Sequence, residues 1–220
     1  MQKTNFVMKA ELNPKKLISF TTIGVAILFL ATYFVSIWDN HNTLCNPFIS
    51  GCSDITHAGF ASYENYMLKA VLIPTATLMA VIYFFIQHWL VEISDYNKSV
   101  IKQGKIILFL AIVGCIGLII GTSVIDGDNT LMKVHLKGVA IFFVTMSVCQ
   151  IWYTVLEFKY TDKVNKAPVM MRRAAIVITA AFSIWSIFMD QTTVNHNIVE
   201  WWGVYALIFW FWTFSLNKRI

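Results

Sequence analysis

The sequence predicts an all-α polytopic membrane protein, a bundle of six transmembrane helices with both termini on the cytoplasmic side. Of its 220 residues, 57% are hydrophobic and only 13% are charged, whereas an ordinary soluble domain is about one quarter charged. Stretches of about 16 to 22 residues without Asp, Glu, Lys or Arg recur along the chain, and a bilayer-spanning helix needs about this length. The sequence lacks the alternation of apolar and polar residues with a period of two that is typical of β-barrel strands.

The predicted spans, all within one domain that covers residues 1–220, are about 17–38, 68–91, 106–125, 135–156, 172–190 and 199–216. The first span resembles a signal peptide at first sight. Its apolar stretch is too long for one, and it ends in the interfacial aromatic residues of ATYFVSIW. We therefore expect the first span to be retained.

The positions of the basic residues predict the orientation. All Lys and Arg residues except Lys69, Lys133 and Lys137 fall in the two tails and in the second and fourth loops. Lys and Arg collect on the cytoplasmic side of membrane proteins. This topology accounts for the net charge of +5 without a nucleic-acid partner, and a basic cytoplasmic face favours anionic lipid. Plasma and internal membranes would give the same pattern.

The first outer loop contains Cys45 and Cys52 in the stretch NHNTLCNPFISGCSD. On the non-cytoplasmic side, their spacing allows a small disulfide-closed loop but does not require one. Cys115 and Cys149 fall inside spans, where small packing residues are expected.

The second span opens with Lys69 in SYENYMLKAVLIP. Two roles are open for its ammonium group: it could extend to the membrane interface, or it could pair with an acid from another helix, for which Glu200 is the first choice. Pro74, one turn deeper, should bend the helix near the same depth.

The third and fourth spans each carry a stripe of small or polar residues. On the third, Gly114, Gly117 and Gly121 share one face, and on the fourth the stripe begins with His135 and Gly138. Such stripes typically face neighbouring helices. Close packing is the expected role of the glycines. For His135 both packing and function remain open, because ionisable groups inside membranes are rare and often functional.

The sixth span begins with an acid directly before a dense aromatic run, VEWWGVYALIFWFWTF. We expect Glu200 to lie in the first turn of this helix, where the free N–H groups favour an anion. It lies near the same outer boundary as several other polar groups. The predicted ligand-binding residues are Glu64, Lys69, Asp126, His135, Glu200 and Trp201.

Several motifs occur in a recognisable order: CNPFIS in the first outer loop, Glu64 before the second span, VHLKGVAIFF in the fourth span and VEWWGVYALIFWFWTF in the sixth. With six spans, they resemble the Frag/DRAM/Sfk family, which includes the damage-regulated autophagy modulators and a lipid-remodelling factor for GPI anchors. The resemblance extends from about residue 45 to the end and implies a role connected with membrane lipids. It singles out Pro47, Ser50, Glu64, His135, Gly138, Glu200 and Trp201.

Three functions fit these observations. The first is binding, sensing or remodelling of a lipid head group at the outer leaflet. The second is a scaffold role, in which the aromatic last helix contacts a membrane protein partner. The third is a metal-dependent lipid hydrolase or acyl transferase, which would require about three His or carboxylate ligands. The chain has no His-x-x-x-His and no nucleophile elbow, so we predict neither a catalytic residue nor a metal or cofactor. Transport is disfavoured, because the span centres almost lack ionisable residues.

Overall fold

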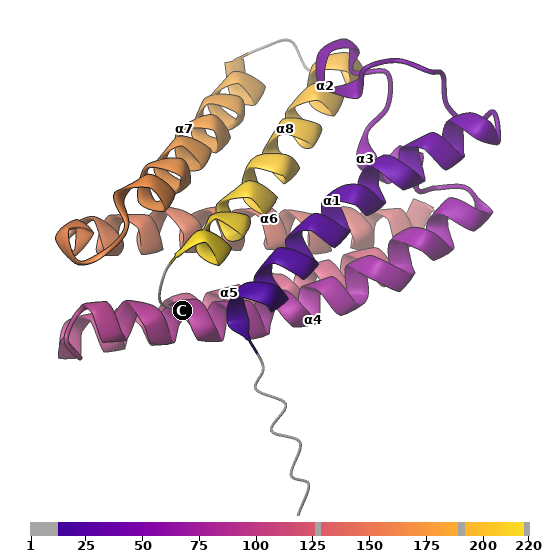
Figure 1. The fold of residues 1–220 in the computed structure, drawn as a ribbon. Helices are drawn as coiled ribbons and strands as arrows, with labels where there is room; N and C mark the ends of the chain where they lie inside the picture. Colours follow the sequence, from indigo (N-terminus) through magenta and orange to yellow (C-terminus); the bar gives the residue numbers. More distant parts are fainter. Residues whose placement is uncertain (1–12, 126–128, 189–191, 218–220) are drawn as a thin grey trace, which may run out of the picture.

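The computed structural model describes residues 13–125, 129–188 and 192–217. Within these ranges the fold is all-α and without strands, as predicted, and its backbone is six long helices (Figure 1). They are α1 Pro14–Trp38, α4 Ser62–Ile93, α5 Lys98–Ser123, α6 Asn129–Phe158, α7 Lys166–Phe188 and α8 Thr193–Trp212.

Four short elements lie between or after the long helices. Two of them shape the first loop: α2 Pro47–Ser50 and α3 Ile55–Ala58. Each begins at a residue whose side chain accepts a backbone N–H: Asn46 accepts from Phe48, and Asp54 accepts from His57. Such capping residues satisfy N–H groups that have no partner within the helix. The other two elements are η1 Thr161–Lys163 and η2 Thr213–Leu216.

Among the described residues, four helices are long and apolar enough to cross a membrane: α1, α4, α5 and α6. Helices α7 and α8 have 23 and 20 residues, but α7 begins with basic residues and α8 with the polar run TVNHN. The prediction of membrane-spanning helices is thus confirmed for four elements. Six spans and the orientation of the termini remain predictions.

The long helices form a closed bundle. Helices α4, α5 and α6 pack in chain order, α7 packs against α8, and α1 contacts both α4 and α8 (Figure 1). The first loop, with α2 and α3, covers the end of the bundle where α1 finishes and α4 and α8 begin. We call this end the disulfide end, because Cys45 and Cys52 lie there in a disulfide.

The α5–α6 interface depends on glycine. A Cβ atom added to Gly138 would lie 2.6 Å from the Gly117 carbonyl oxygen, and one added to Gly117 would lie 2.8 Å from the Gly138 oxygen. Contacts this short are not sterically allowed, so the two backbones touch only because both residues lack a side chain. The prediction that the glycine stripe serves close helix packing is confirmed.

The aromatic residues of α8 lie largely inside the bundle. Trp201 and Trp210 are both fully buried. The Trp210 ring packs 5.6 Å from Tyr153 and 4.8 Å from Phe214, measured between ring centroids. Trp202 is exposed, and Tyr205, Phe209 and Trp212 are half-buried. Trp201 and Trp210 therefore stabilise the interior, and they are not available to a membrane partner.

Candidate functional site

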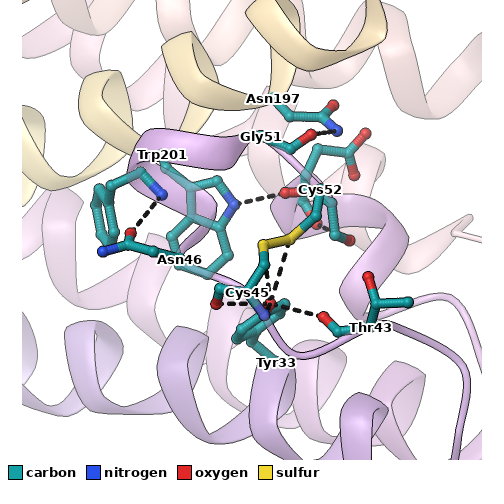
Figure 2. Close-up of a disulfide and its surroundings, with 11 residues drawn as sticks. Tyr33, Thr43, Cys45, Asn46, Gly51, Cys52, Asn197 and Trp201 are labelled. Atoms are coloured by element: carbon teal, nitrogen blue, oxygen red, sulfur yellow. Dashed lines mark hydrogen bonds between the residues drawn. A yellow bond between two sulfur atoms is a disulfide. The ribbon is translucent and has the colours of Figure 1, made fainter.

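At the disulfide end, the first loop is organised around Tyr33 of α1 (Figure 2). The buried Tyr33 hydroxyl lies 3.1 Å from the carbonyl oxygens of Thr43 and Cys45, and it accepts the Cys45 backbone N–H at 3.2 Å. It also lies 3.3 Å from the Cys52 Sγ atom. The disulfide and the tyrosine together fix the path of the loop over the end of α1.

Helix α8 holds the same loop from the other side. The Trp201 indole N–H donates to the Ser53 carbonyl oxygen at 2.8 Å, and the Asn197 amide donates to that of Gly51, also at 2.8 Å (Figure 2). Gly51 has a positive φ of 55°, and a Cβ there would lie 2.2 Å from the Val194 carbonyl oxygen. The turn at Gly51 therefore requires glycine twice, for its backbone conformation and for its approach to α8.

His135 of α6 is buried beneath this loop, with 3% of its surface exposed. Its Nδ1 atom lies 2.9 Å from the Gly121 carbonyl oxygen, and its Nε2 atom lies 3.4 Å from the Thr56 hydroxyl. A carbonyl can only accept, so Nδ1 carries the proton, and in the neutral ring Nε2 is an acceptor. The imidazole thus ties α6 to the last turn of α5 and to α3.

Glu200 of α8 lies opposite the same segment. The backbone N–H groups of Ile55 and Thr56 act as hydrogen-bond donors toward its carboxylate, and the Asp54 carboxylate contributes a nearby negative charge. Thr56 therefore contacts His135 through its side chain and Glu200 through its backbone. The structure brings these two predicted site residues, from different helices, to one place.

Beneath them lies a cavity of about 80 Å³ inside the bundle. Its walls come from α1, α3, α4, α5, α6 and α8, and are mainly aliphatic and aromatic, with a few threonines. Of the described residues that line the cavity, only His135 and Glu200 are ionisable. The cavity is thus apolar along its length and carries acceptor groups at the disulfide end.

Lys69, another predicted site residue, lies away from the cavity. The Lys69 Nζ atom donates to the Ile125 carbonyl oxygen at 3.0 Å, and the Asn65 amide donates to the same oxygen at 3.1 Å. A cation at this position complements the negative C-terminal end of α5. Lys69 therefore caps α5, and the described contacts do not pair it with Glu200. Asp126 lies outside the described residues.

Glu64 lies in the first turn of α4 and is fully buried. One of its carboxylate oxygens, Oε1, lies 2.9 Å from the Nδ1 atom of His41, but neither residue lines the cavity. The five predicted ligand-binding residues that the structure describes thus do not form a single cluster. Trp201 fixes the loop, Lys69 caps α5, and only His135 and Glu200 face the cavity.

Comparison with known protein families shows to which family the chain belongs. Residues 15–217 match the family described as the Frag1/DRAM/Sfk1/Cwh43P N-terminal domain. The chain belongs to this family. No curated protein and no solved structure matches it.

The residues singled out by the family resemblance have definite positions in this Frag1/DRAM/Sfk1 domain. Pro47 is buried and begins α2, whereas Ser50 at the end of α2 is exposed. Gly138 forms the backbone contact with α5. These motif residues thus build the scaffold, and His135 and Glu200 stand out as the motif groups that reach the cavity.

One pair was missed by sequence reasoning, which counted Arg172 among the basic residues of the fourth loop. In this Frag1/DRAM/Sfk1 domain Arg172 of α7 is fully buried and bonds Glu157 of α6, which is also fully buried. The sequence held one signal, because the two opposite charges stand at facing ends of the fourth and fifth predicted spans. Their pairing depends on how α6 and α7 turn toward each other, which spacing does not supply.

Proposed function

We propose that the protein is a six-span membrane protein that binds a lipid, with a short segment of one lipid chain in the cavity and the polar end of the lipid at His135 and Glu200. The observation that supports this best is the composition of the cavity wall, which is apolar except at one end. A lipid is divided in the same way, into an apolar chain and a polar head group. The volume of about 80 Å³ is several times the roughly 10–15 Å³ that one water requires. It has room for a short run of methylene groups.

The chemistry at the polar end favours a head group that donates hydrogen bonds. Nε2 of a neutral His135 is an acceptor, because Nδ1 carries the proton for Gly121. The Glu200 carboxyl group offers an acceptor oxygen whether it is protonated or ionised. A head group with an amine or hydroxyl satisfies both groups, whereas a quaternary ammonium has no N–H to donate.

We further propose that the disulfide end faces the non-cytoplasmic side. A disulfide persists in an oxidising compartment, and the basic residues of the second and fourth loops would then face the cytoplasm. The lipid would accordingly enter from the outer or lumenal leaflet.

The test compares two phospholipids that share acyl chains but differ in donors. Phosphatidylethanolamine and phosphatidylcholine are added in equal amounts to purified protein in detergent, and retained lipid is measured by native mass spectrometry. We expect wild type to retain the ethanolamine lipid preferentially and Glu200→Gln to lose that preference. Val204→Phe should lower retention of both lipids, because Val204 lines the cavity.

Val177→Phe is the matched control, since the same substitution on α7 falls at a side chain that is 67% exposed. It should leave retention unchanged. Equal retention by wild type, Val204→Phe and Val177→Phe would refute lipid binding in the cavity. If Glu200→Gln still prefers the ethanolamine lipid, the proposed role of the Glu200 carboxylate is refuted, but lipid binding in the cavity is not.

A further inference from the structure

We propose that Asp39, His41 and Glu64 form a binding site for a divalent metal ion, with zinc as the cation that best fits the donors. The site is independent of the proposed lipid function, because none of the three residues lines the cavity. It joins the end of α1 and the start of α4, two helices that the first loop separates in sequence.

The three side chains converge in space. One ligand atom from each, a carboxylate oxygen or an imidazole nitrogen, lies within 4.8 Å of the other two. In tetrahedral coordination, two ligands that are each about 2.0–2.2 Å from the zinc ion stand about 3.3–3.6 Å apart. Asp39 and His41 are accessible to solvent, so small side-chain rotations close the remaining difference.

Glu64 supplies the observation that points to a ligand. Its side chain is fully buried, and its Oε1 atom contacts His41 Nδ1 at 2.9 Å. The other oxygen, Oε2, is also buried and has no hydrogen-bond partner among the described residues. A buried carboxylate oxygen without a partner is costly. A bound cation in this cluster would satisfy it.

The backbone holds two of the ligands in place before any ion binds. The His41 backbone N–H donates to the Ser36 carbonyl oxygen at 2.8 Å, and Asn40 between the two ligands has a positive φ of 60°. This tight turn sets Asp39 and His41 at the end of α1. The C-terminal end of a helix favours positive charge, and the last turn of α1 contains no basic residue.

The donor set defines the class of ion. Two carboxylates and one imidazole are ligands that zinc accepts, and three protein ligands leave a fourth position for water. Calcium prefers six to eight oxygen ligands, which makes it the poorer candidate. The inference concerns metal binding between α1 and α4 and involves no reaction.

The experiment uses full-length protein in detergent after removal of any histidine tag. Protein stripped with EDTA is titrated with Zn²⁺ against a chromogenic chelator, and bound zinc is counted by plasma mass spectrometry. We expect one zinc per chain. Asp39→Asn, His41→Ala and Glu64→Gln should each weaken the affinity by at least about tenfold, because even an outer partner of a metal ligand contributes about 10–100-fold.

His57→Ala is the matched control, because His57 is an exposed histidine on α3 outside the cluster. It should bind zinc like wild type. Glu64→Gln alters a buried group, whereas Asp39→Asn alters an accessible one and separates lost binding from lost folding. Zinc should also raise the Tm of wild type and His57→Ala more than that of Asp39→Asn, since an ion that binds the folded state stabilises it in proportion to its affinity.

Two results would overturn the proposal. One is the absence of stoichiometric zinc binding by wild type, which would leave His41 and Glu64 as a simple polar pair. The other is zinc binding that Asp39→Asn and His41→Ala share with wild type at equal affinity. Neither result affects lipid retention in the cavity.

Discussion

The guanidinium of Arg172 on α7 bonds both carboxylate oxygens of Glu157 on α6 in the interior of the protein. Its Nε atom donates to Oε2 at 3.0 Å and its Nη2 atom to Oε1. The third nitrogen, Nη1, donates to the Thr213 hydroxyl at 3.2 Å, and the guanidinium carbon Cζ lies 4.2 Å from the centroid of the Phe214 ring. Because α6 and α7 otherwise meet over a small interface, this pair is a principal connection between them.

Replacing one member of the pair should destabilise the protein strongly. Arg172→Met leaves the Glu157 charge buried without its partner, and such losses cost about 3–5 kcal/mol. The expected result is a large fall in Tm, measured by thermal unfolding in detergent. Arg173→Met is the neighbouring control. Arg173 is only partly buried and donates to the Thr161 hydroxyl, so its replacement should cost about 1–2 kcal/mol.

The double variant Glu157→Leu with Arg172→Met separates charge from packing. Replacing both members of a buried ion pair by apolar residues is often neutral or stabilising. We therefore expect the double variant to unfold at a higher temperature than either single variant. Additive losses would show that packing, and not the unpaired charge, carries the effect.

Gly51→Ala should detach the first loop from α8. A non-glycine residue in the left-handed conformation costs about 1–2 kcal/mol, and the added Cβ would also meet the Val194 carbonyl oxygen. The expected outcome is a lower Tm. Gly24→Ala on α1 is the comparison, because a Cβ there meets nothing within 4 Å. It should be neutral or stabilising, since alanine favours a helix by about 1 kcal/mol over glycine.

The disulfide predicts a labelling pattern. Cys115 and Cys149 are buried free thiols, so a bulky maleimide should react with the native protein only after mild reduction releases Cys45 and Cys52. Mass spectrometry would then show two added labels. Labelling without reduction would contradict the disulfide. The same experiment with a membrane-impermeant maleimide on intact cells tests the proposed orientation. We expect labelling without permeabilisation. Labelling only after permeabilisation would contradict that orientation.

Reduction should also lower stability. The two cysteines are seven residues apart in sequence, and closing a loop of this size contributes up to about 2.5 kcal/mol in the chain-entropy description. The check is the Tm of the protein with and without reductant. The double variant Cys45→Ser and Cys52→Ser should show the lower value in both conditions.

His135→Ala should destabilise the protein more than His135→Asn. The alanine leaves the buried Gly121 carbonyl oxygen without the Nδ1 donor, at a cost of about 1–3 kcal/mol. The asparagine amide places an N–H near the Nδ1 position and should restore most of the loss. Equal Tm values for the two variants would show that this hydrogen bond contributes little. His57→Ala, at an exposed position, should match wild type.

The long helices could be predicted from the sequence because their cause is local. The first predicted span, about 17–38, corresponds to α1 Pro14–Trp38, and the second, about 68–91, lies inside α4 Ser62–Ile93. The observed helices are longer because a helix continues past the last apolar residue when charged side chains can reach water. The charge-free stretches therefore predicted where the helices lie better than they predicted the residues at which the helices begin and end.

The site could be predicted only in part. The prediction that Glu200 lies in the first turn of its helix is wrong, because α8 already begins at Thr193 and its first turn contains no acidic residue. The carboxylate interacts instead with the amides of α3, which belongs to a distant segment. The role of Lys69 depends on where α5 ends relative to α4, and that is a property of packing. Sequence spacing fixes which residues share one helix face, but it does not fix which neighbour that face meets.

The bonds from α8 to the first loop have a consequence for synthesis. Asn197 and Gly51 are 146 residues apart, and Trp201 and Ser53 are 148 apart. A ribosome finishes the first loop long before it begins α8, so for most of translation the loop lacks these two bonds to α8. Native docking is completed only when the chain is nearly whole. A premature stop codon anywhere before residue 197 would therefore leave the first loop without either of these bonds.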